Sequence, residues 1–238
     1  MHRFTAINVG GSSMPLLVTH PDEGAGPFPA IVLMPHRTGI DVFTQDRAER
    51  LAAIGIVSAA PDVYHRHALE VPTSEAKDHL VDSEIEADIG AALGVLRADK
   101  RVDPARIGIL GHCQGGRTGL LGMVAYADSF CAGAIYYSGN VFKRMGEPGP
   151  APFDRMAVIK FPVAGFFGKE DKNPSPDDVS KIDAEMTRLG ISHEFHSFDG
   201  AGHAFQDFTD PRRGCEPQGA QAWEMTLEFL KRELRLGA

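Results

Sequence analysis

The 238-residue sequence contains little cysteine, no long apolar run and no concentration of positive charge. Its three cysteines show no Cys-x-x-Cys spacing, which argues against a disulfide framework and indicates reduced thiols in the cytoplasm. No apolar run approaches the length of a membrane span, and the first residues lack the apolar stretch of a signal peptide. A net charge of −8 without a basic block argues against nucleic-acid binding. We therefore expect a cytoplasmic protein without nucleic-acid or membrane partners, for which a monomer is plausible.

The composition is that of a globular chain, and its length suits one sizeable core, so we expect a single domain over 1–238. Apolar runs alternate with segments of helical spacing, which is typical of an α/β fold with a mostly parallel sheet and helices on both faces. We predict strands over 3–9, 16–19, 30–34, 56–60, 106–110, 132–137, 163–167 and 193–198. We predict helices over 43–54, from an N-cap at Ser83 to Leu96, over 115–126 and 178–189, and at the C-terminal end with Ala220, Trp223, Leu227, Leu230 and Leu234 buried. Residues 145–153, rich in Gly and Pro, are predicted to form a loop.

A cysteine stands at the tip of a predicted strand–turn–helix segment. The sequence Gly111-His112-Cys113-Gln114-Gly115 follows the Gly-x-Ser-x-Gly pattern with cysteine in place of serine. Such an elbow strains the tip residue and exposes its side chain above the sheet. The tip is also a helix N-terminus, where the dipole favours a thiolate. The pattern therefore indicates that Cys113 is a nucleophile.

A histidine and an acid follow two later predicted strands. His203 lies in Gly200-Ala201-Gly202-His203-Ala204-Phe205 after the strand 193–198, and Asp171 follows the strand 163–167. The order nucleophile, acid, histidine is that of the α/β-hydrolase triad. His203 would exchange protons with the thiol and later activate water, and Asp171 would orient the imidazole. Glu170 and Asp62 are the competing candidates for the acid.

An oxyanion would require backbone N–H donors beside the nucleophile. The predicted donors are Gln114, which follows the cysteine, and Arg37, in the turn after the strand 30–34. Aromatic and polar residues after strand ends are predicted to line the pocket, namely His36, Tyr64, Tyr137 and Phe205. His65 and His67 could suggest a metal pair, but no third ligand has supportive spacing, so we expect neither metal nor cofactor.

These motifs together resemble the dienelactone hydrolase family, which has the α/β-hydrolase fold. The resemblance rests on the Gly-x-Cys-x-Gly-Gly elbow, Pro61-Asp62-Val63-Tyr64, Gly168-x-x-Asp171 and Ala201-Gly-His-x-Phe205, in that order. It extends from about residue 30 to the last helix. It implies a Cys113–His203–Asp171 triad and hydrolysis of a lactone or ester through an acyl-cysteine.

Two positions depart from the family pattern. His36 stands where family members place an acidic residue beside the cysteine, and Gln206-Asp207 stands where an arginine grips the substrate carboxylate. Arg37, Arg66 or Lys77 are candidates to replace that arginine. The alternatives are therefore a broad-specificity carboxylesterase or thioesterase, and a non-catalytic binding or thiol-sensing protein of the same fold.

A cysteine nucleophile also bears on the substrate. A thiolate leaves readily from its own tetrahedral adduct, so acylation favours substrates with good leaving groups such as enol esters and enol lactones. The sequence accordingly predicts a small-molecule ester or lactone as the substrate.

Overall fold

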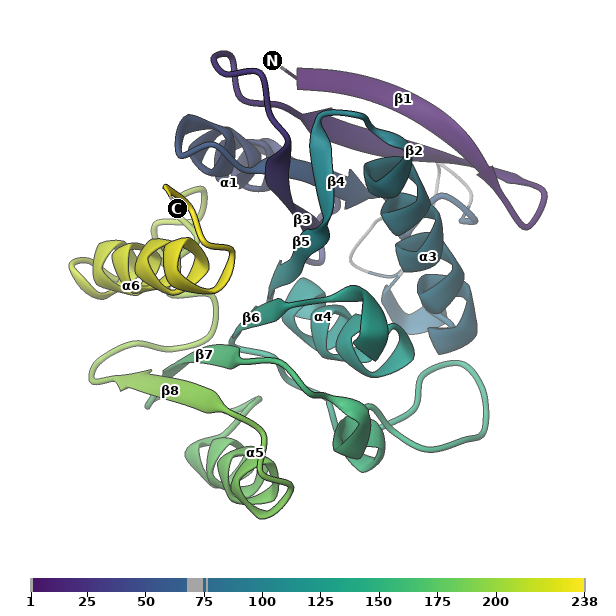
Figure 1. The fold of residues 1–238 in the computed structure, drawn as a ribbon. Coiled ribbons are helices and arrows are strands. Elements are labelled where there is room, and N and C mark those ends of the chain that lie inside the picture. Colours follow the sequence, from purple (N-terminus) through teal and green to yellow (C-terminus); the bar gives the residue numbers. More distant parts are fainter. Residues whose placement is uncertain (1, 68–74, 76, 238) are drawn as a thin grey trace.

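A computed structural model describes residues 2–67, 75 and 77–237, and eight strands form one sheet in it. The strand order across the sheet is β1-β2-β4-β3-β5-β6-β7-β8 (Figure 1). The strands are β1 (His2–Val9), β2 (Ser12–Thr19), β3 (Phe28–Met34), β4 (Val57–Pro61), β5 (Val102–His112), β6 (Ala132–Tyr136), β7 (Val163–Gly168) and β8 (His193–Phe198). β3 to β8 run parallel to one another, whereas β1 and β2 form an antiparallel hairpin at one edge and β2 also pairs antiparallel with β4. The predicted mostly parallel sheet is confirmed.

Helices cover both faces of the sheet (Figure 1). They are α1 (Val42–Ala53), α3 (Asp82–Ala98), α4 (Gln114–Ala125), α5 (Pro176–Arg188) and α6 (Gln218–Glu233), with short 3₁₀ turns η1 (Lys77–His79), η2 (Ala127–Ser129) and η3 (Phe153–Val158). One apolar cluster joins α3, α4 and α5 to the sheet, and a second joins α1 and α6 to the opposite face. β3, β6 and β7 are apolar throughout because both of their faces are buried, whereas the edge strand β8 carries polar residues and is only partly buried.

The largest differences from the predicted helices and strands are four. β2 begins at Ser12 rather than at residue 16. Ser83 is not the N-cap of α3, which begins at Asp82, and the N–H and hydroxyl of Ser83 instead donate to Glu147. β5 begins at Val102 rather than at Arg106. In α6, Ala220 is exposed, and Thr226 belongs to the buried face because its hydroxyl donates to the Ala222 carbonyl. A polar residue whose side chain is hydrogen-bonded within its own helix can occupy a core position, and a pattern of apolar residues alone does not reveal it.

The carboxyl ends of the parallel strands all lie at the same edge of the sheet. β5 is followed by Cys113, β7 by the turn that contains Asp171, and β8 by the segment that contains His203. Ligands in open parallel sheets bind at this edge. Among the described residues, no helix is long and apolar enough to cross a membrane.

Candidate active site

Cys113 occupies the tip of the turn between β5 and α4. Its backbone has φ 57° and ψ −119°, a conformation that L-residues rarely adopt. The N–H of Cys113 donates to the Tyr136 carbonyl at 3.1 Å, and its carbonyl accepts from the N–H of Arg117 at 3.2 Å. The surrounding backbone therefore compensates for the strain and holds the thiol in place.

Glycines on both sides of the tip allow main-chain atoms to approach closely. A Cβ on Gly111 would lie 2.0 Å from the Gly115 carbonyl oxygen, and one on Gly115 would lie 2.2 Å from the Met34 carbonyl oxygen. Neither neighbour is a flexible side chain that could move aside. Glycine is therefore needed at these two positions because there is no space for a Cβ.

The substitution Gly111→Ala is expected to lower the free energy of unfolding by about 3 kcal/mol, because the added methyl group would force the strand and helix apart. Urea denaturation would measure the change. Gly94→Ala provides a matched control, since Gly94 is exposed in α3 with nothing within 4 Å of its Cβ position. That variant should gain about 0.5–1 kcal/mol from helix propensity. Equal stability of the two variants would contradict the steric explanation.

The thiol, an imidazole and a carboxylate form a row at this edge of the sheet. Cys113 Sγ lies 3.0 Å from His203 Nε2, and His203 Nδ1 lies 2.9 Å from Asp171 Oδ2. The second oxygen of Asp171, Oδ1, accepts from the N–H of Asn173 at 2.9 Å. Asp171 is 5% exposed, so both of its oxygens are held away from solvent.

The competing acids lie elsewhere. Asp62 accepts from the backbone N–H of Tyr64 at 3.0 Å and thereby caps the turn after β4. The side chain of Glu170 is exposed. Among these three acids, the one in contact with His203 is Asp171, as the sequence predicts.

The row favours a thiolate–imidazolium pair. Burial opposes the thiolate, but the hydrogen bond from His203, its charge, the N–H of Gln114 and the Arg37 guanidinium lower the pKa of Cys113. Burial would also lower the pKa of His203, but its bonds to Asp171 and Cys113 raise this pKa to about 10. The two values belong to the coupled pair, and both directions favour separated charges.

Cys113 opens onto two small cavities, and a third adjoins them. The first, of about 150 Å³, is lined by Arg37, Cys113, Gln114, Gly139, Asn140, Asn173 and His203. The second, of about 140 Å³, is lined by His36, Arg37, Thr38, Asp41, Cys113, Ala204, Asp207, Thr209, Asp210 and Arg213. The third, a vestibule of about 450 Å³, is lined by Arg37, Asp171, Lys172, Asn173, His203 and Arg213. We call these the amide cavity, the acidic cavity and the cationic vestibule.

Arg37 is common to all three cavities. Its guanidinium forms no ion pair or side-chain hydrogen bond with any residue that the structure describes. Arg37 therefore presents an uncompensated positive charge next to Cys113. Its backbone N–H, with that of Gln114, is the predicted oxyanion donor.

Of the predicted pocket residues, His36 lines a cavity, whereas the three aromatic residues are largely buried. His36 lines the acidic cavity, where its Nε2 lies 2.8 Å from Asp41 Oδ2 and 2.8 Å from Thr38 Oγ1. Although burial opposes this, the bonds from His36 and Thr38 lower the pKa of Asp41 to about 2. His36 is therefore held by its own loop.

The predicted aromatic residues are largely buried. Tyr64 is 7% exposed, and its hydroxyl has no hydrogen-bond partner among the described residues. Tyr137 and Phe205 are fully buried rather than lining the three cavities. The Tyr137 ring packs edge-on against His203, with ring centroids 5.3 Å apart, and against Phe205. Tyr137 therefore restricts the position of the His203 imidazole, and Phe205 restricts the position of Tyr137.

Of the other candidates for a residue that binds the substrate carboxylate, Arg66 already has an acidic partner. Arg66 pairs with the buried Asp88 through two hydrogen bonds of 2.8 and 2.9 Å, so its charge is compensated. His65 also contacts Asp88, at 3.0 Å. The Lys77 side chain lies outside the described part of the structure. Within the described ranges, no group of three or more His, Cys, Asp or Glu residues could hold a metal ion.

Sequence reasoning missed several residues of the site. Asn140 and Asn173 face the thiol across the amide cavity, and Lys172 and Arg213 line the vestibule. Asn173 could have been suspected, because it follows the acid by two residues. Asn140 lies in a loop of no distinctive pattern, and only the fold brings it to Cys113.

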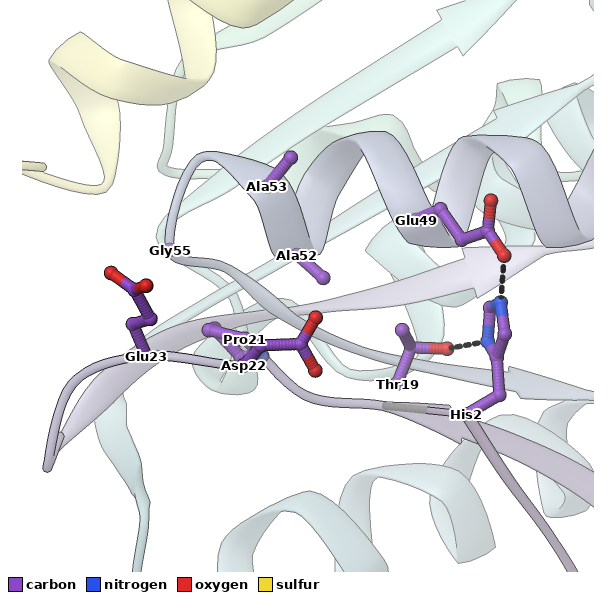
Figure 2. A pocket seen from close by; sticks show the side chains of 9 residues that line it. All are labelled: His2, Thr19, Pro21, Asp22, Glu23, Glu49, Ala52, Ala53 and Gly55. Carbon is purple, nitrogen blue, oxygen red and sulfur yellow. Dashed lines mark hydrogen bonds and ion pairs between the residues drawn. The ribbon is translucent and has the colours of Figure 1, made fainter.

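A further cavity, of about 580 Å³, lies elsewhere (Figure 2). It lies between the end of β2 and the C-terminal end of α1, where His2 contacts Thr19 and Glu49. Gly55, one of its lining residues, directly precedes β4, so this cavity lies at the amino edge of the parallel strands. It is therefore on the opposite edge from Cys113.

Comparison with known proteins identifies relatives over almost the whole chain. The dienelactone hydrolase family matches residues 14–234. A carboxymethylenebutenolidase from Rhodococcus opacus is 27% identical over 244 residues, covering 96% of this chain and 90% of that protein. A Bradyrhizobium protein named "Probable 2-oxo-3-(5-oxofuran-2-ylidene)propanoate lactonase" is 32% identical over 218 residues, covering 87% of this chain and 84% of that protein.

A solved structure shows the same fold. The crystal structure of a dienelactone hydrolase-like promiscuous phosphotriesterase from metagenomic libraries superposes with a TM-score of 0.81 at 20% identity, covering 98% of each chain. The strand order, the edge at which Cys113 lies and the family match agree with one another. The chain belongs to the dienelactone hydrolase family and is a hydrolase with the α/β-hydrolase fold.

Proposed function

We propose that this protein hydrolyses a small ester or enol lactone through an acyl-cysteine on Cys113, with His203 as acid and base and Asp171 orienting His203. The observation that carries the proposal is the row Cys113 Sγ–His203 Nε2–His203 Nδ1–Asp171 Oδ2, with contacts of 3.0 and 2.9 Å. A nucleophile, a base and a group that orients the base within hydrogen-bond reach are the requirements of covalent catalysis.

The reaction balances with these groups alone. The thiolate of Cys113 attacks the carbonyl carbon, and the backbone N–H groups of Gln114 and Arg37 bind the resulting oxyanion. The imidazolium of His203 gives its proton to the departing oxygen, which leaves an acyl-cysteine and a neutral imidazole. His203 then takes a proton from water, and the hydroxide attacks the thioester. The thiolate leaves, the acid is released and the resting pair is restored.

The leaving group belongs on the side of His203, because this residue must protonate it. His203 lines the amide cavity and the vestibule but not the acidic cavity. The vestibule carries Arg37, Lys172 and Arg213, and Arg213 lies 3.3 Å from Asp210. Its positive charge suits a negative group attached to the leaving group. The name of the Bradyrhizobium relative describes an enol lactone whose leaving group carries the carboxylate.

Trapping the intermediate tests the proposal. A slow enol ester mixed with the protein and quenched in acid should add one acyl group to the peptide that contains Cys113, as measured by mass spectrometry. Cys131→Ala should still show the adduct, since Cys131 is a half-buried thiol remote from the row. No adduct on the wild-type protein, with turnover persisting in Cys113→Ala, would reject the acyl-cysteine route.

The substitution Arg37→Met is expected to lower kcat/KM by about 10–100-fold for an ester with a carboxylate on its leaving group, because the cation that would bind this carboxylate is lost. The neutral analogue should change by less than about threefold. Steady-state kinetics on the matched pair of esters would measure both. Arg50→Met is the control, since Arg50 lies on α1 and pairs with Asp46. Equal losses on both esters would favour the broad-specificity carboxylesterase.

A further inference from the structure

The wall of the amide cavity is a short strained segment that follows β6. Tyr137 has φ 33° and Asn140 has φ 57°, in the region that L-residues rarely adopt. Each such residue costs about 1–3 kcal/mol and persists only when its surroundings hold it. Gly139 and Asn140 line the same cavity as Cys113, so the segment lies where a substrate would bind. The groups that hold it therefore bear on the proposed reaction.

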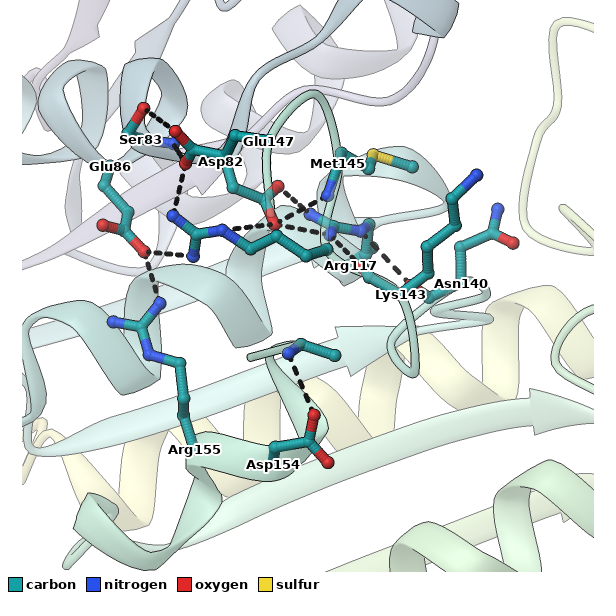
Figure 3. A network of polar contacts seen from close by, with 12 residues as sticks. Asp82, Ser83, Glu86, Arg117, Asn140, Lys143, Met145, Glu147, Asp154 and Arg155 are labelled. Carbon is teal, nitrogen blue, oxygen red and sulfur yellow. Dashed lines mark hydrogen bonds and ion pairs between the residues drawn. The ribbon is translucent and has the colours of Figure 1, made fainter. Parts of the chain in front are cut away.

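A buried ion pair holds the segment from one side (Figure 3). Arg117 is 1% exposed and Asp82 is fully buried, and two hydrogen bonds of 2.7 and 2.8 Å join them. Arg117 Nε also donates to the Asn140 carbonyl at 3.3 Å, and its Nη2 donates to the Lys143 carbonyl at 2.7 Å. Asp82 Oδ2 accepts from the N–H of Met145 at 3.2 Å. The pair thus binds the backbone of 140–145 at three points.

Arg117 connects this segment to the nucleophile. It lies in the first turn of α4, and its N–H donates to the carbonyl of Cys113. Its guanidinium therefore sets the spacing between the helix that follows the thiol and the wall of the cavity. The planar guanidinium of arginine donates in several fixed directions, so it suits this purpose better than the ammonium group of a lysine.

The turn that contains Asp171 holds the segment from the other side. Asn173 Oδ1 accepts from the N–H of Asn140 at 3.1 Å, and the N–H of Asn173 donates to Asp171. The Cβ position of Gly139 is only 2.5 Å from Asn173 Oδ1, so the two segments are in direct contact. Asn140 is therefore held between the helix of the nucleophile and the turn of the acid.

We propose that Arg117 is a positioning residue of the hydrolytic reaction, which acts by holding the Asn140 wall of the amide cavity at a fixed distance from Cys113. This inference rests on the proposed function for its kinetic consequence. Arg117 takes no part in bond making, so its removal should misplace the substrate without disarming the thiol. A misplacement of about 1 Å can lower a rate by about 100-fold.

Two variants separate positioning from folding. Arg117→Lys keeps a charge beside Asp82 but cannot make the forked bonds to the carbonyls. Asp82→Leu/Arg117→Met removes both charges together, because deleting one partner alone would leave a buried charge uncompensated, whereas replacing the pair with apolar residues is often neutral for stability. Arg155→Met is the matched control, since Arg155 pairs with Glu86 in the same polar cluster (Figure 3).

Three measurements test the inference. For the two Arg117 variants we expect kcat/KM for an enol ester to fall by about 10–100-fold, with alkylation of Cys113 by iodoacetamide within about twofold of wild type. Hydrogen exchange of the peptide 138–145 should become faster. Arg155→Met should match wild type in all three.

The outcomes distinguish the two proposals. If wild type forms no acyl adduct and turns over no ester, the proposed function fails, and hydrogen exchange still reports whether Arg117 tethers the segment. If wild type is active and a folded Arg117 variant retains its kcat/KM, the positioning role is overturned and the ion pair serves stability alone. Loss of alkylation together with turnover would also overturn it, because the thiol itself would then have been disturbed.

Discussion

Cys113→Ala is expected to lower kcat for an enol ester by at least about 10³-fold, because the residual rate would come from binding and the oxyanion donors alone. Among the residues that the structure describes, the nucleophile at His203 Nε2 is Cys113, whose sulfur lies 3.0 Å away. The measurement is steady-state turnover of a chromogenic enol ester by purified variants. Circular dichroism melting should confirm that the variant is folded, since Ala fits wherever Cys does.

Cys131→Ala and Cys215→Ala are the matched controls for this substitution. Burial raises the pKa of Cys131, which keeps that thiol protonated and unreactive. Cys215 Sγ lies 3.3 Å from Gln218 Oε1 at the start of α6. Both variants should retain full turnover. Substantial activity in Cys113→Ala, or its loss in Cys131→Ala, would refute the assignment of the nucleophile.

His203→Ala is expected to abolish turnover and to slow alkylation of Cys113 at pH 6 by about 100-fold. Without the imidazolium the thiol would return toward its ordinary pKa of about 8.5, where only a small fraction is thiolate at pH 6. The measurement is the iodoacetamide rate from pH 5 to pH 10. At pH 10 the variant and wild type should react at similar rates, since both thiols are then ionised.

His196→Ala is the control for this variant, because His196 lies in β8 and stacks on Phe166 of the neighbouring β7. It should alkylate as wild type does at every pH. A His203→Ala protein that still alkylates rapidly at pH 6 would show that the helix dipole and Arg37 lower the pKa of the thiol without the imidazole.

The same pair sets the pH dependence of wild-type turnover. The thiolate forms as pH rises through the lowered pKa of Cys113, and the imidazolium is lost as pH rises through the His203 pKa of about 10. Turnover should therefore rise with pH on the acid side, reach a plateau through neutrality and fall near pH 10. A profile that rises up to pH 9 would indicate a neutral resting pair.

The sequence predicted the elements that depend on local pattern. Apolar runs located the central parallel strands such as β3 and β6, since a strand buried on both faces is apolar throughout. In α6, Trp223, Leu230 and Leu234 are buried as predicted, but Ala220 is exposed and the buried Thr226 was missed. The start of α3 was also wrong, since Val81 offers no side-chain cap and the acceptor for Ser83, Glu147, is 64 residues away.

The row of Cys113, His203 and Asp171 could be predicted because each follows a strand, and topology then brings the three together. The walls of the cavities could not. Asn140 and Asn173 meet through a hydrogen bond between segments 33 residues apart. His36 was predicted as a possible neighbour of the thiol, but its bond to Asp41 depends on the turn between them, which local pattern does not specify.

The close approach of Gly111, Gly115 and Met34 has a consequence for how specificity can change. These contacts join main-chain atoms, so the backbone position of Cys113 is set by the main chain around it. Several side chains that line the acidic cavity come instead from separate loops and include Thr38 and Thr209. Randomising those two positions would vary substrate preference while the reactive centre stays in place. Chemistry and selectivity are in this sense separate modules, open to independent redesign.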